Sequence, residues 1–247
     1  MDASSKGKGT SGTRSLTGCG CRKMRYLWQT LAAICLLALG GMVWSCSNVN
    51  KYDESKYERK YEGYSEERLK KIIDDNPSNL EAYAELGRHY MELGWSDTIT
   101  QDKYWALGCE NFKRAGERGH AIAQYNVGVC YINGWGVEKD ENEAYKWWMM
   151  GASQGYPSAE AAVGKCHFNG WGVPKDEKEA MKWWRKAADS NDIDGMVAMA
   201  YSYFMGTGVE KDNEEGLKWA QKAADLGDDS ALMYYKYVVI GDNAQEN

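Results

Sequence analysis

Three residue types are scarce in this 247-residue chain: proline, phenylalanine and histidine each occur three times. Few prolines leave long stretches free to form helices, because proline removes a backbone donor and clashes with the preceding turn. The histidines are His89, His120 and His167, and none has a second ligand-type residue at the spacing of a metal site. We therefore expect neither a metal nor another cofactor.

Catalytic motifs are missing as well. The only Ser-x-x-Lys is Ser5–Lys8 near the start of the chain, and no Lys-Thr-Gly accompanies it, which disfavours a serine acylase. The recurring Gly-x-Gly-Val segments lack the Lys-Ser/Thr of a phosphate-binding loop. We expect a protein that is not an enzyme, and keep an envelope hydrolase of the penicillin-binding or β-lactamase kind as the disfavoured alternative.

Basic residues are concentrated at the start of the chain. Residues 1–45 hold six of the 30 basic residues and one of the 36 acidic residues, which leaves the remainder with a net charge of −11. Nucleic-acid binding needs clustered lysine and arginine, so an acidic body of this kind argues against such a partner.

An apolar run near the N-terminus predicts a membrane-targeting segment. Residues 1–23 are small and polar and predict a disordered tail. No charge occurs from Tyr26 to Asn50, and the apolar centre, Leu31–Val43, has a length typical of a secretory signal and short for a membrane span. Met24 is a possible alternative start of the chain.

The end of this run, Ser45-Cys46, resembles a bacterial lipoprotein signal. The resemblance implies cleavage after Ser45 and lipidation of Cys46, although Trp44 departs from the usual small or aliphatic residue. An uncleaved anchor helix is the second reading, and a segment of neither kind stays open. Either of the first two places the protein at a membrane of the cell envelope, with its body facing the periplasm or the surface.

The strongest signal is a repeat of 36 residues. Gly134–Val137, the acid Asp140, Ala144 and the pair Trp147-Trp148 all recur 36 residues later. Most of them recur again after another 36. An altered copy precedes them, with about five extra residues that we assign to a loop over Gly94–Asp102.

Each unit reads as two helices. In the second unit the first helix is predicted over Ala121–Ile132, with apolar residues on two faces, as in a stacked array. Gly-x-Gly-Val closes it, and an aspartate opens the second helix. Three positions depart from the pattern, His167, Ala200 and Gly216, and there we expect looser packing.

These motifs resemble the Sel1-like repeat, a relative of the tetratricopeptide repeat. The resemblance implies an all-α fold, a right-handed α-solenoid of antiparallel helix pairs, and a protein-binding scaffold or adaptor. The expected segments are a tail (1–23), a signal or anchor (24–46), a tether (47–64), a capping helix (65–77), a divergent repeat (78–119), three regular repeats (120–155, 156–191, 192–227) and a closing helix with a tail (228–247). Tyr57, Tyr61 and Tyr64 of the tether are expected to dock on the first repeat.

In the related repeats the first helices form the concave face, so the resemblance implies a groove for a protein or peptide. The residues carried over to this face are Arg88, Tyr125, Val129, Ile132, Asn133, Lys165, Phe168, Asn169, Tyr201 and Phe204. The alternative is that Tyr125, Phe168 and Phe204 serve packing between repeats.

The cysteines of the repeats predict buried thiols. Cys130 and Cys166 occupy the same place in successive units. Neighbouring helices lie about 8–10 Å apart, which is too far for a disulfide between these two residues.

Overall fold

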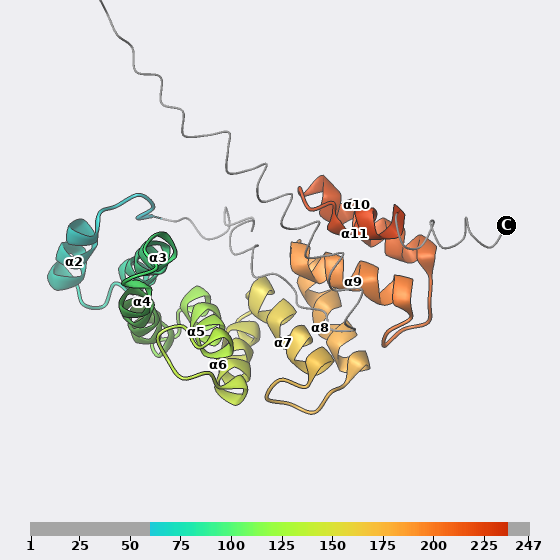
Figure 1. Ribbon diagram of the computed structural model, residues 1–247, viewed down its shortest axis with the longest axis horizontal. Coiled ribbons are helices and arrows are strands. Elements are labelled where there is room, and N and C mark those ends of the chain that lie inside the picture. Colours follow the sequence, from blue (N-terminus) through green and yellow to red (C-terminus); the bar gives the residue numbers. More distant parts are fainter. Residues whose placement is uncertain (1–59, 237–247) are drawn as a thin grey trace, which may run out of the picture. The chain divides into compact units, whose positions relative to one another are not determined.

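The computed structural model describes residues 60–236, and that part of the chain is helical, with no strand. Its helices follow one another along an array, from blue to red in Figure 1. They are α2 (Glu66–Asp75), α3 (Leu80–Ser96), α4 (Gln101–Gly116), α5 (Ala121–Asn133), α6 (Glu141–Ser153), α7 (Pro157–Asn169), α8 (Glu177–Asp189), α9 (Ile193–Met205), α10 (Asn213–Asp225) and α11 (Ser230–Tyr234). The predicted all-α solenoid is confirmed. None of these helices is long and apolar enough to cross a membrane.

The predicted helix ends are confirmed in the three regular repeats. Asp140, Asp176 and Asp212 cap α6, α8 and α10, and each side chain accepts hydrogen bonds from two backbone N–H groups. Gly134, Gly170 and Gly206 close α5, α7 and α9 in the left-handed conformation that favours glycine. The recurring motif is therefore a pair of helix caps joined by a turn.

A glycine and a tryptophan bring the two helices of a repeat together. The indole of Trp148 lies on Gly128, and its Nε1 donates to the Tyr125 carbonyl oxygen at 3.0 Å. One repeat later Trp184 lies on Gly164 and donates to the Ala161 carbonyl oxygen at 3.2 Å. No side chain fits between ring and backbone at either place.

The fourth repeat is closely packed with different residues, so the expectation of looser packing at Ala200 and Gly216 is wrong. Ala200 replaces the glycine and Ala220 the tryptophan, and both are fully buried. Phe204 fills the remaining space by packing on Gly216, where a Cβ would lie 2.5 Å from the phenyl ring. The two departures from the pattern compensate each other.

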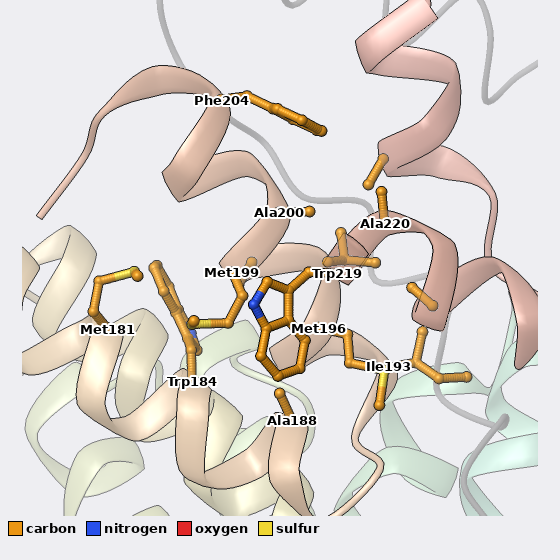
Figure 2. Close-up of a cluster of buried hydrophobic side chains, with 14 of the residues drawn as sticks. Met181, Trp184, Ala188, Ile193, Met196, Met199, Ala200, Phe204, Trp219 and Ala220 are labelled. Carbon is orange, nitrogen blue, oxygen red and sulfur yellow. The ribbon is translucent and has the colours of Figure 1, made fainter. Parts of the chain in front are cut away.

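Successive repeats share a continuous core. Figure 2 shows Trp184 of α8 and Trp219 of α10 approaching Met196 and Met199 of α9 within one buried cluster. Upstream, Trp147 packs against the cluster that contains Cys109 and Cys130, in the preceding junction. Each first helix is therefore buried on two sides, as the two-faced apolar pattern predicted.

The extra residues of the first repeat lengthen its helices, so the prediction of a loop over Gly94–Asp102 is wrong. The α3 helix has 17 residues and α4 has 16, against 13 in each regular helix, and only residues 97–100 separate them. Gly94 is a buried helical residue on which the Trp105 ring packs. The added residues therefore extend the helix pair by about one turn.

The described ends of the array are capped by aromatic residues. Tyr61 is buried beside α2 and α3, its hydroxyl accepts from Asn79 Nδ2 at 2.8 Å, and Tyr64 packs edge-on against it. Docking is thus confirmed for these two tyrosines, whereas Tyr57 lies outside the described residues. At the other end α11 packs on α10 and α9, and residues beyond 236 of the predicted closing helix are likewise outside that range.

Candidate binding surface

The residues assigned to the binding face form rows across α5, α7 and α9. One row contains Val129, Lys165 and Tyr201, which lie 36 residues apart. Lys165 Nζ pairs with Asp194 Oδ2 at 2.6 Å, and the Tyr201 hydroxyl donates to the Ser230 carbonyl oxygen at 3.4 Å. Burial raises the pKa of Tyr201 to about 12. This row therefore also joins each repeat to the next.

The second row is more deeply buried. Ile132 packs against the core, the Phe168 ring lies 5.3 Å from that of Trp184, and Phe204 is buried. Tyr125, one turn before Val129 on the same helix, stacks edge-on against Tyr156 at 5.7 Å. The aromatic members of the predicted face thus all take part in packing.

The last residues of the three first helices form a third row, which we call the outer row: Asn133, Asn169 and Met205. Asn133 and Asn169 donate to the carbonyl oxygens of Val129 and Lys165, and the side chain of Asn169 is exposed. Met205 is 49% exposed. The sequence prediction missed Met205, although the 36-residue period points to it.

Arg88 lies apart from these rows. Its guanidinium pairs with Glu85 and Glu92 on its own helix, and Glu85 is buried. The pairing holds the pKa of Arg88 above its ordinary value, chiefly through the hydrogen bond to Glu85. Arg88 therefore presents a neutralised, anchored group.

A second apolar surface was not predicted. The rings of Trp95, Trp105 and Trp135 lie 5.0–5.8 Å from one another. Trp95 is 55% exposed and the nearby Ile99 is 92% exposed. The signal was present in the sequence as Trp95 within the added segment of the first repeat and Trp105 just after it.

The histidines serve structure. His120 caps α5, with Nδ1 accepting from the Ala123 N–H at 3.2 Å and Nε2 lying 2.9 Å from Glu81 Oε2. His167 packs edge-on against Tyr145. Within residues 60–236 no three histidine, cysteine or acidic side chains gather as metal ligands would.

A surface depression of about 710 Å³ lies between two turns, lined by residues 175–178 and by Gly206, Gly208, Val209 and Glu210. Two of its three acidic groups are engaged: Asp176 caps α8, and Glu177 pairs with Lys175 at 2.9 Å. No acid there is held close to a nucleophile, so the depression offers no acid–base or nucleophilic pair.

Comparison with known families now decides the identity of the repeats. The model of the Sel1 repeat matches residues 121–156, 157–192 and 193–228. These are Sel1 repeats. The first helix pair of the chain, α3 and α4, precedes the three matched Sel1 repeats and keeps their glycine contacts, with Phe112 lying on Gly87.

Solved structures agree with the Sel1 assignment. A protective antigen of uropathogenic Escherichia coli with an SLR fold is similar at 32% identity and a TM-score of 0.59, over 70% of this chain and 36% of that one. A Sel1 repeat protein from Oxalobacter formigenes is similar at 27% identity and a TM-score of 0.59, over 72% of this chain and 76% of that one. The chain thus spans about a third of the antigen's length. No protein with a curated description matches the sequence.

Proposed function

We propose that this chain is a scaffold that binds a protein or peptide ligand through the outer row of its Sel1 repeats, without catalysing a reaction. The observation that carries the proposal is that this row recurs in three successive repeats, with Asn169 and Met205 exposed, beside the row of Ile132, Phe168 and Phe204. Two amides and a thioether at equal steps offer both polar and apolar contacts to an extended or helical peptide.

The chemistry of the row suits a polypeptide. The amide oxygen of the exposed Asn169 can accept from a backbone N–H group of a ligand, while its amide N–H donates to the Lys165 carbonyl oxygen within the helix. Met205 is flexible and polarizable and adapts to an apolar side chain of a ligand. Because the row stands on helix ends fixed by glycine caps, binding orders few additional groups.

The proposal is tested by site-specific photo-crosslinking in the full-length protein. A photoreactive residue at Asn169 or Met205 is expected to capture one defined protein, whereas the same residue at Met150 is expected to capture none. Met150 is a matched control, because it is similarly exposed at 42% but lies on the second helix α6. Equal capture from all three positions would overturn the assignment of the face.

The captured protein then allows a binding measurement. Asn169→Arg is expected to weaken its affinity about tenfold or more, the effect of one unpaired charge at an interface, with the melting temperature unchanged. If the captured molecule were chemically altered instead of merely bound, the scaffold proposal would be wrong and the hydrolase alternative would stand.

The second part of the proposal is attachment to an envelope membrane through the N-terminal segment, with Cys46 as the lipidated residue. Cys46 lies outside the described residues, and its support is the sequence resemblance to a lipoprotein signal. Metabolic labelling with an alkynyl fatty acid is expected to mark the protein, and Cys46→Ala is expected to abolish the label. Label retained by Cys46→Ala would exclude this residue, and membrane association without label would favour an uncleaved anchor.

A further inference from the structure

Two buried thiols meet at the junction between the first and second helix pairs. Cys109 lies in α4 and Cys130 in α5, both are free thiols, and the two side chains lie together inside one buried apolar cluster. Cys109 is 1% exposed and Cys130 is fully buried. The binding surface described above uses neither residue.

The repeat pattern supports this geometry independently. Position 109 corresponds to Tyr145 in the next repeat, and position 130 corresponds to Cys166. Tyr145 packs against the cluster that contains Cys166, as Cys109 does with Cys130. One repeat further the pair is Met181 and Ser202, both buried. This second-helix to first-helix contact recurs along the array, and only the first such junction of the described residues carries two thiols.

We propose that Cys109 and Cys130 form a disulfide that fastens the divergent first repeat to the three regular repeats. Formation of the bond requires the two sulfurs within this cluster to close to the bonding distance of about 2 Å. The two residues are 21 positions apart along the chain, so the bond would close a loop over the turn at Glu117–His120.

The two thiols differ in their surroundings in the folded protein. Contact with Cys130, and to a smaller extent the ammonium of Lys113, lowers the pKa of Cys109 against the opposing effect of burial. Lys113 stands one turn along α4, and its Nζ donates to the Tyr131 hydroxyl at 3.0 Å, next to Cys130. The pKa of Cys130 is raised by the same contact and by burial.

The reaction requires a disulfide-bearing oxidant, such as a thiol oxidoreductase in its disulfide form or oxidised glutathione. The Cys109 thiolate attacks one sulfur of that disulfide, forms a mixed disulfide and releases the first donor thiol. Cys130 then loses its proton, attacks the Cys109 sulfur and releases the second donor thiol. The protein loses two electrons and two protons, and the donor disulfide is reduced to two thiols.

The burial of both sulfurs determines when the disulfide can form. An oxidant cannot reach either sulfur in the folded protein, so the bond forms during folding or when α4 and α5 separate. The proposal does not depend on the binding face, and it is tested with the purified full-length chain in detergent.

The test is refolding of the reduced, denatured protein with reduced and oxidised glutathione, followed by trypsin and mass spectrometry. Trypsin places the three thiols in separate peptides, residues 104–113, 119–139 and 166–175. We expect the first two peptides to be linked, with a loss of about 2 Da against their sum, and Cys166 to remain free. Peptides 104–113 and 119–139 that stay unlinked in correctly folded protein would overturn the proposal, as would a link from either to another cysteine.

Cys130→Ser and Cys166→Ser are matched variants, because they occupy the same place in successive repeats and serine stands there naturally as Ser202. Oxidation is expected to raise the melting temperature by roughly 5–10 °C. Cys166→Ser should keep that shift, and Cys130→Ser should lose it. A shift that survives Cys130→Ser would show that another pair of cysteines is responsible.

An engineered disulfide at the next junction tests whether the two junctions have the same geometry. Tyr145→Cys should create a second pair with Cys166, so that peptides 140–146 and 166–175 become linked under the same conditions. Failure of this variant to form the link, while it folds, would contradict the equivalence of the two junctions.

Discussion

Gly164→Ala is expected to destabilise the protein by about 3 kcal/mol, because it forces a methyl group into a packed ring and breaks its hydrogen bond. A Cβ at Gly164 would lie 2.4 Å from Trp184 Cδ1 and 2.5 Å from Nε1. The ring must move, and with it the hydrogen bond to Ala161 is lost. Thermal unfolding followed by circular dichroism should show a fall of roughly 6–12 °C in the melting temperature.

The double variant Gly164→Ala/Trp184→Ala separates the clash from a general effect of alanine. Trp184→Ala alone should cost about 3–5 kcal/mol. Adding Gly164→Ala should cost almost nothing more, because the ring is gone, as in the natural pair Ala200 and Ala220. A double-variant cost equal to the sum of the two single costs would contradict the account.

Gly172→Ala is expected to weaken the stacking of the second repeat on the third. Gly172 has a φ of +66°, and a Cβ there would lie 2.4 Å from the Glu141 carbonyl oxygen at the start of α6. Gly172 lies in the turn after α7, and the Glu141 backbone cannot yield without disturbing the start of α6, so we expect a loss of about 3 kcal/mol or more, from the sum of conformational strain and overpacking. Urea unfolding should also become broader, since the two halves of the array become less coupled.

Gly155→Ala is the matched control for this effect. Gly155 has a similar φ of +77°, but nothing lies within 4 Å of the Cβ that would be added. Its cost therefore measures the strain of the left-handed conformation alone, about 1 kcal/mol. If Gly155→Ala and Gly172→Ala cost the same, the close approach of the two repeats would contribute nothing.

Much of the fold could be predicted because its signals lie at fixed steps along the sequence. The aspartate caps and the glycine helix ends recur every 36 residues and act within their own repeat, as do Trp148 and Trp184, whereas Trp147 packs across the junction to the preceding repeat. Tyr61 and Tyr64 could be placed for a similar reason, since their spacing matched one side of a short helix.

The features that the sequence did not predict lie mainly in or beside the first repeat, which is longer than the three regular repeats. Gly94 looked like a loop residue, but its missing side chain admits Trp105 within a longer helix. Cys109 and Cys130 are not related by the period, so the search for equivalent cysteines compared Cys130 with Cys166 and did not consider Cys109. The binding face was carried over as a set of positions, and sequence could not tell which side chains the neighbouring repeat would cover, as it does Phe204.

The pairing of large and small side chains within one repeat affects how an array of such repeats can evolve. Gly128 fits Trp148, Gly164 fits Trp184, and Ala200 fits Ala220, so each unit carries both halves of its own fit. Duplication or recombination at the turns between units preserves these pairs, whereas a crossover between the two helices of a unit would join a tryptophan to an alanine. The solenoid can therefore gain or lose whole repeats. The boundary at which recombination preserves these side-chain pairs lies before the first helix of each repeat.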